Sequence, residues 1–204
     1  MRGETWPLGR LAAFVVGVAL VFVAELPPLE RLTFELLSAH LLQNVVLAEW
    51  APALLVFGLP PHTSRELARY APPLFVLPLW LANYFAWHLP PAYDTALEHQ
   101  SSLLHLEHAC YLVTGILFWL PVAHGALSNG AKAVYIFAAF LLASPLGLLL
   151  ALLPSAVYDF YDGHWGLSAL TDQQIAGVTM VSEQALVFFA VFAFYALRFL
   201  EEER

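Results

Sequence analysis

Four histidines stand out as residues whose type and spacing could support chemistry. His105 and His108 are three positions apart, so they share a helical face and can ligate one ion or two adjacent ions. His40 and His88 lie within or at the end of two other apolar runs. Imidazole nitrogen is a preferred ligand of copper and zinc. The sequence therefore predicts a nitrogen-rich site for a transition metal.

Carboxylates and a thioether extend this candidate site. Asp172 can bind a metal or accept an imidazole N–H, and Met180 offers the soft sulfur that Cu(I) favours. Glu35 and Glu107 are further candidates for supporting carboxylates, although helical spacing turns Glu107 away from the face of the histidine pair. The predicted metal ligands are His40, His88, His105, His108, Asp172 and Met180.

Composition places these side chains in a membrane protein. Of the 204 residues, 60% are hydrophobic and 12% are charged, and the mean hydropathy of +0.70 lies outside the range of soluble domains. The net charge of −8 argues against nucleic acid or anionic lipid as the main partner, because both favour basic clusters. One cysteine, Cys110, excludes an internal disulfide and a cysteine-rich metal site. Histidine must therefore supply most of the ligands.

Six apolar stretches separated by short polar joints predict about six transmembrane helices. They cover residues 8–26, 32–58, 72–89, 103–123, 131–153 and 173–199. Proline pairs such as Pro27-Pro28 and Pro90-Pro91 lie between them, where a missing backbone N–H is tolerated. We expect an all-α polytopic bundle that forms one transmembrane domain over residues 1–204, with the first apolar run retained as a helix.

The distribution of basic residues predicts the orientation of the bundle. Of the eight Lys and Arg residues, only Arg31 falls on the side opposite to the others in a six-helix arrangement. Cytoplasmic loops carry an excess of such residues, so we expect both termini in the cytoplasm and the candidate histidines at the depth of the outer leaflet. Long outer loops are expected at 90–102 and 154–172. The histidines expected to be solvated are His62, His99, His124 and His164.

Two further acids, Glu49 and Glu183, lie deep in the predicted second and sixth helices. Ionisable groups within a bilayer are costly and normally turn inward to a partner or a cavity. Each could be a proton or ion relay, or a protonated carboxyl that is hydrogen-bonded to a neighbouring helix. Their distance along the helices from the histidine layer makes them poor candidates for direct metal ligands.

Strings spread over about residues 35 to 185 resemble those of a known family. The strings are His40-Leu-Leu-Gln-Asn44, Ala51-Pro-Ala-Leu-Leu-Val-Phe-Gly-Leu-Pro60, Trp87-His-Leu-Pro90, His105-Leu-Glu-His108 and the run from Trp165 to Gly177, followed by Met180. They resemble the membrane-embedded cytochrome c oxidase assembly factor family that is called CtaG in Gram-positive bacteria. The family's motif residues carried over are His40, His88, His105, His108, Asp172, Gln173 and Met180.

The resemblance implies a multi-pass plasma-membrane protein that assists the assembly of caa-type haem-copper oxidases by supplying or inserting copper. Its implied partners are the lipid bilayer, oxidase subunits and other copper chaperones, with a homo-oligomer as a further expectation. One position departs from the family pattern, because Asn44 stands where the family often has a second histidine. His40 is then the single imidazole contributed by its helix.

A copper-handling assembly factor that is not an enzyme is therefore the function we expect. The main alternative is a membrane-embedded oxidase or hydrolase that uses the same histidines, with Glu107 or Asp172 as general acid or base, although no HExxH-type signature occurs. A b-type cytochrome and an ion transporter are further alternatives. Zinc or another transition metal in place of copper also stays open.

Overall fold

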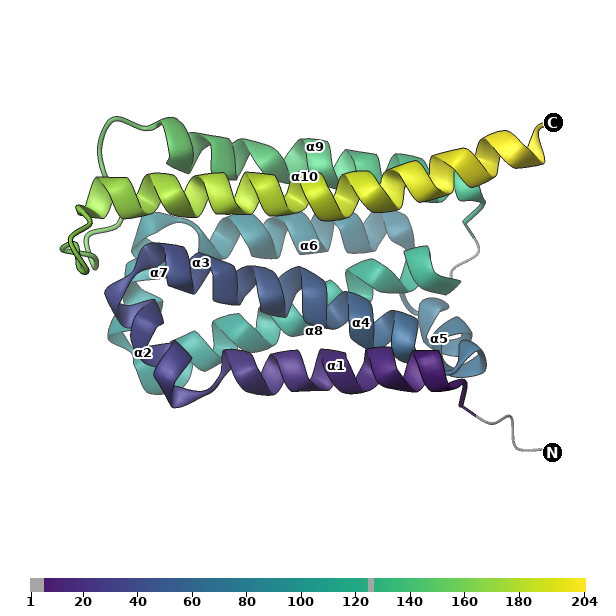
Figure 1. Ribbon diagram of the computed structural model, residues 1–204, viewed down its shortest axis with the longest axis horizontal. Coiled ribbons are helices and arrows are strands. Elements are labelled where there is room, and N and C mark those ends of the chain that lie inside the picture. The colour runs from purple at the N-terminus through teal and green to yellow at the C-terminus, as the bar shows by residue number, and fades with distance from the viewer. Residues whose placement is uncertain (1–5, 125–126) are drawn as a thin grey trace.

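The structure, a computed structural model, describes residues 6–124 and 127–204, with the backbone alone at residues 100 and 101, and these residues form helices and no strand. Its helices are α1 (Leu8–Ala24), α2 (Pro27–Glu35), α3 (Leu37–Val45), the π-helical η1 (Val46–Trp50), α4 (Ala51–Gly58), α5 (Pro61–Ala68), α6 (Pro73–Trp87), α7 (Pro90–Glu98), the π-helical η2 (Gln100–Leu104), α8 (His105–His124), α9 (Asn129–Leu152) and α10 (Ala169–Glu202). The long helices run side by side, and α1 begins at the end of the bundle where α10 finishes (Figure 1).

Several of these helices match the length and composition of membrane spans. Four qualify alone: Leu37–Gly58, Ser102–His124, Asn129–Leu152 and Ala169–Glu202. Helices α1 and α2 form a fifth if the pair, bent by 56°, is a single span. Helix α6 is apolar but has only 15 residues, fewer than the ~20 that a bilayer requires. The chain is thus an all-α, multi-pass membrane protein, and the count of six spans stays a prediction.

The predicted second helix, 32–58, is wrong at its start because the chain breaks at Leu36. This residue is extended (φ −132°, ψ 123°), so residues 32–35 belong to α2 and a new helix begins at Leu37. The carboxylate of Asp172 on α10 accepts the backbone N–H of Leu37 at 2.6 Å and that of Ser38 at 3.2 Å. A side chain distant in the sequence therefore caps α3, which no local pattern could reveal.

The outer loop expected at 90–102 is largely helical. Pro90 and Pro91 occupy the first turn of α7, where a missing N–H is harmless and the fixed φ favours a helix. The second expected loop keeps its irregular structure between α9 and α10, and it is tied down by Asp94, which accepts the backbone N–H groups of Asp159 and Phe160 at 3.3 Å. This short helix and this loop cover the end of the bundle that holds the histidines.

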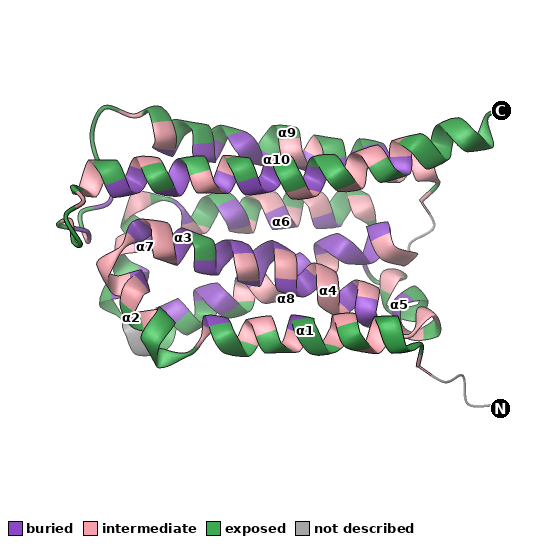
Figure 2. Ribbon diagram, viewed as in Figure 1, coloured by how far each residue is buried: buried purple, intermediate pink, exposed green. Residues whose placement is uncertain are grey.

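Burial is concentrated along the α3–α4 helix and α8 in the middle of the bundle (Figure 2). The outer helices α1, α9 and α10 expose large apolar side chains instead, such as Leu142 and Leu186. Such an apolar surface is suited to contact with lipid. The central helices also carry buried polar residues, which in a membrane protein mark the parts most relevant to function.

Small residues allow the helices to approach one another closely. A Cβ added at Gly115 of α8 would lie 2.2 Å from the carbonyl oxygen of Ala48, and one at Gly177 of α10 would lie 2.4 Å from the backbone nitrogen of Ala151. Association of transmembrane helices relies on such backbone contact, because lipid removes the usual hydrophobic driving force. The first contact sets the distance between α8 and η1, and the second sets the distance between α9 and α10.

Candidate functional site

His40 lies at the centre of the candidate site and is fully buried on α3. Its Nδ1 is 2.8 Å from the hydroxyl of Tyr93 and 3.2 Å from that of Tyr161. Tyr161 donates its hydroxyl to the carbonyl of Thr33 at 2.8 Å, and burial raises the pKa of this tyrosine well above its ordinary value. Two neutral hydroxyls therefore fix the ring and leave Nε2 as the nitrogen that can bind another group.

Glu107 lies next to this nitrogen, contrary to what helical spacing predicted. Its carboxyl is fully buried, with Oε2 4.0 Å from His40 Nε2. The Asn44 amide donates to Glu107 Oε1 at 3.0 Å and so holds this carboxyl beside His40. The inward face at the start of α8 includes Glu107 and Tyr111, which are buried at helical spacing with Leu104 of η2.

His108 provides a second buried imidazole. Its ring centre is 6.1 Å from that of His40, and the two ring planes are inclined by 76°. Its Nδ1 lies 2.8 Å from Glu25 Oε1 without the geometry of a hydrogen bond, and Nε2 also has no hydrogen-bond partner in the described part of the chain. His105 is exposed. The predicted histidine pair on α8 is thus divided between the interior and the surface.

His88 follows α6 and is buried in a neighbouring environment. Its Nδ1 is 2.7 Å from the carbonyl oxygen of Tyr84, and its ring centre is 6.2 Å from that of Tyr93. Nε2 again lacks a partner among the described residues. His88 lines a small cavity together with Met180, and neither His40 nor His108 is among the described residues of that lining. His88 and Met180 therefore share surroundings that differ from those of the His40–His108 pair.

The two polar residues that begin α10 have structural partners. Asp172 caps α3, as described above, and hydrogen-bonds the Ser38 hydroxyl. The Gln173 side chain accepts the Val157 N–H at 2.8 Å and donates to the carbonyls of Leu150 and Ser155, so it anchors the α9–α10 loop. These hydrogen bonds already use the groups that a metal ion would need.

The candidate residues therefore converge only in part. Within residues 6–124 and 127–204, no group of three or more His, Cys, Asp or Glu side chains is placed to hold a metal ion. The arrangement instead offers two buried imidazoles, His40 and His108, each with a carboxylate nearby. Tyr93 and Tyr161 were not among the site residues that the sequence indicated, because they lie outside the apolar helices, in α7 and in the α9–α10 loop.

The histidines outside the candidate set are mostly exposed. This holds for His62, His99 and His164. His124 differs from expectation, because it is half-buried and its Nε2 lies 3.0 Å from Arg10 Nη1. It belongs to the opposite end of α8 from the candidate site.

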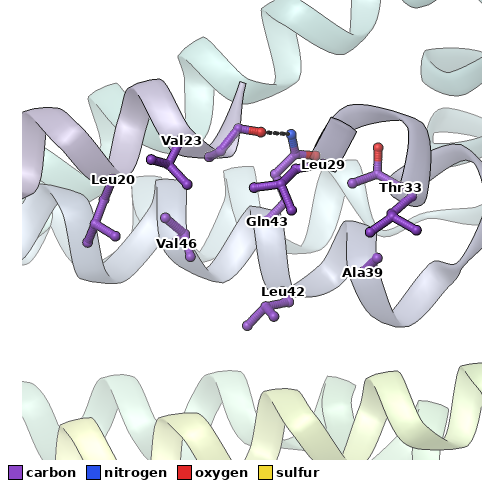
Figure 3. A pocket seen from close by; sticks show the side chains of 10 residues that line it. Leu20, Val23, Leu29, Thr33, Ala39, Leu42, Gln43 and Val46 are labelled. Carbon is purple, nitrogen blue, oxygen red and sulfur yellow. Dashed lines mark hydrogen bonds between the residues drawn. The ribbon is translucent and has the colours of Figure 1, made fainter. Parts of the chain in front are cut away.

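A larger, apolar pocket lies beside the site, at the junction of α1, α2 and α3 (Figure 3). Its volume is about 230 Å³, and its lining includes Val23, Leu29 and Leu42. The polar head of Gln43 donates to the Ala24 carbonyl at 2.7 Å, the contact drawn as a dashed line (Figure 3). This amide closes the end of α1, and the pocket offers no polar group suited to metal binding among its described residues.

Comparison with known proteins adds a family match and two distant relatives. The sequence model of the family described as "Cytochrome c oxidase caa3 assembly factor (Caa3_CtaG)" matches residues 1–202. Uncharacterized proteins of Mycobacterium bovis and Mycobacterium tuberculosis are each 22% identical to the chain over 207 residues, covering 87% of this chain and 28% of the relative. The chain thus spans less than a third of the length of these curated relatives. No solved structure matches it.

Proposed function

Because this chain belongs to the cytochrome c oxidase caa3 assembly factor family, we propose that it binds a copper ion as cargo and presents it to an oxidase subunit. The proposed ligands are the Nε2 atoms of His40 and His108. One observation carries this assignment: both imidazoles are buried with their ring centres 6.1 Å apart, and each has Nε2 without a partner in the described residues, while His40 Nδ1 is hydrogen-bonded to Tyr93 and His108 Nδ1 lies 2.8 Å from Glu25. Metal-binding histidines typically have this arrangement.

The surroundings of the pair favour copper in its monovalent state. Cu(I) is soft, accepts imidazole and tolerates few ligands, which suits a cargo that must later be released. Glu107 lies beside His40 and Glu25 beside His108, and a carboxyl that loses its proton when the ion binds offsets the cost of a cation in the membrane. His105, exposed one helical turn before His108, is placed to receive the ion from the membrane surface.

Copper loading of the purified protein tests this proposal. The chain would be reconstituted in lipid nanodiscs, loaded with Cu(I) under reducing conditions against a competing chelator, and assayed by elemental analysis. We expect one copper ion per chain in the wild type and at least tenfold weaker retention in His40→Ala and His108→Ala. His99→Ala is the matched control, because His99 is exposed outside the site, and it should retain copper.

A wild-type protein that binds no copper would contradict the proposal. Equal retention by the His40→Ala variant would also contradict it.

A further inference from the structure

A second polar cluster lies deeper in the bundle than the proposed copper site. Its centre is a pair of carboxyls, Glu49 on η1 and Glu183 on α10, and Glu49 lies nine residues beyond His40, or ~13 Å along the helix. The Trp50 indole donates to Glu183 Oε1 at 2.5 Å, and the Gln184 amide donates to Glu49 Oε1 at 3.3 Å. The other oxygen of each carboxyl lacks a hydrogen-bond partner in the described part of the chain.

The backbone around Glu49 holds this side chain inside the bundle. Val46–Trp50 forms a π-helical turn, a distortion that frequently marks functional sites. The Trp119 indole donates to the carbonyl of Glu49 at 3.0 Å, and the missing side chain of Gly115 makes room for the carbonyl of Ala48. Helix α8 is therefore shaped to fit the distorted turn and fixes its position.

Two ionised carboxylates are not compatible with these surroundings. Glu49 and Glu183 are 1% and 8% exposed in helices that span the membrane. Each carboxyl interacts electrostatically with the other. The remaining described groups that interact with them are Trp50, Gln184 and the Tyr84 hydroxyl, and none of these is a cation. Two like charges in a medium of low dielectric constant repel strongly and are poorly solvated. At least one positive charge must therefore accompany the pair.

A small cavity lies between Glu49 and His88. Its lining includes Asn44, Glu49, Tyr84, His88, Tyr111 and Met180. The volume of about 10 Å³ is close to what a single water molecule needs. His88 Nε2 and Asn44 Oδ1 are buried without described partners, and because His88 Nδ1 faces the Tyr84 carbonyl at 2.7 Å, its Nε2 is assigned as the acceptor nitrogen. One water in this cavity would satisfy these groups and Glu49 together.

We propose that Glu49 and Glu183 form an intramembrane proton-binding site, which exchanges its proton with His88 through one water molecule in this cavity. The acid form of Glu49 donates its proton to the water, and the water donates a different proton to His88 Nε2, so that charge moves and no atom is lost. A metal cation fits less well, because the pair offers too few oxygen atoms without partners. The site requires no copper and stands independently of the proposed function.

Infrared spectroscopy of the reconstituted protein tests this site. The carbonyl stretch of a protonated carboxyl is distinct from that of a carboxylate and shifts when H₂O is replaced by D₂O. We expect this band at neutral pH in the wild type and a clear loss of its intensity in the Glu49→Gln, Glu183→Gln double variant, in which neutral amides preserve the shape of the side chains; the buried Glu107 carboxyl is unchanged in this variant, so the difference between the two spectra reports on the pair. Glu66→Gln, which changes an exposed carboxyl on α5, should retain it.

The exchange route is tested by His88→Phe, which removes the acceptor nitrogen at similar ring size. The band should persist in this variant, showing that the pair is intact, but its shift in D₂O should be at least severalfold slower than in the wild type. A wild type without the band at neutral pH would overturn the proposal. So would a band of unchanged intensity in the double variant, one that develops only after sodium and potassium are removed, or an exchange rate unchanged in His88→Phe.

Discussion

At the scale of single residues, the candidate site combines groups that the sequence identifies with groups that only the structure reveals. His40, His88 and His108 are buried as expected for functional polar residues in a membrane protein. The burial of Glu107 and the exposure of His105 were not predictable from an i, i+3 spacing, because that spacing does not specify how α8 is rotated about its axis. Packing of α8 against α6, η1 and α4 determines this rotation, and the Asn44–Glu107 hydrogen bond forms on the inward face that results.

Introducing a histidine at position 44 should strengthen copper binding. The Asn44 amide is 3.0 Å from Glu107, which in turn lies beside His40, so an imidazole there would enter the site. We expect Asn44→His to tighten Cu(I) binding by ~10-fold, or ~1.4 kcal/mol, in a chelator-competition titration. Asn129→His, at the exposed start of α9, should leave the affinity unchanged. Equal affinities in the wild type and Asn44→His would place the ion away from Glu107.

Removing the carboxyl of Glu107 should weaken binding. Glu107→Gln keeps an oxygen that can accept from Asn44 but loses the group that can become anionic, 4.0 Å from His40 Nε2, when copper binds. In the same titration we expect Cu(I) affinity to fall by ~10-fold, since buried charges are weakly screened. The exposed Glu98→Gln serves as the control. Unchanged affinity in Glu107→Gln would mean that the carboxylate does not contribute to the ion's environment.

At the scale of secondary-structure elements, the apolar stretches of the sequence predicted where most long helices lie. They did not predict two local features, a break in one helix and a π-helical turn. The break at Leu36 depends on a cap supplied by Asp172 from 135 residues away. The π-helical turn at Val46–Trp50 depends on α8, where Gly115 and Trp119 accommodate it. Both features are tertiary, so the hydrophobicity of the segment itself carries no sign of them.

Asp172 should therefore affect stability rather than metal content. Asp172→Ala removes the acceptor of the Leu37 and Ser38 N–H groups, and loss of a helix N-cap costs ~1–2 kcal/mol. We expect a lower thermal unfolding temperature and unchanged copper stoichiometry in elemental analysis. A variant of normal stability that has lost its copper would instead identify Asp172 as a ligand.

The contact between α9 and α10 should be sensitive to side-chain size. At Gly177, a Cβ would lie 2.6 Å from the Gly147 carbonyl oxygen as well as close to Ala151. Gly177→Leu should separate the helices and lower the unfolding temperature of the reconstituted protein by several degrees, while Gly9→Leu, at a position with open space around it, should be tolerated. Equal unfolding temperatures for the two variants would contradict the close packing.

At the scale of the whole molecule, composition alone identified a multi-pass helical membrane protein, and the structure adds how its polar groups are layered. The copper candidates lie at the end covered by α7 and the α9–α10 loop, and the Glu49–Glu183 pair lies further along the central helix. The sequence could not show this layering in full, because it depends on which helices are neighbours. The charge distribution predicts that the opposite end, where α1 begins, is cytoplasmic.

X-ray absorption at the copper edge tests the central claim most directly. The protein loaded with one equivalent of Cu(I) should show a first shell of two nitrogen atoms with the outer scattering typical of imidazole, and no sulfur. In the His40→Ala, His108→Ala double variant this signal should disappear. A first shell containing sulfur, which would implicate Met180 or Cys110, or an imidazole signal that survives in the double variant, would contradict the assignment of copper to His40 and His108.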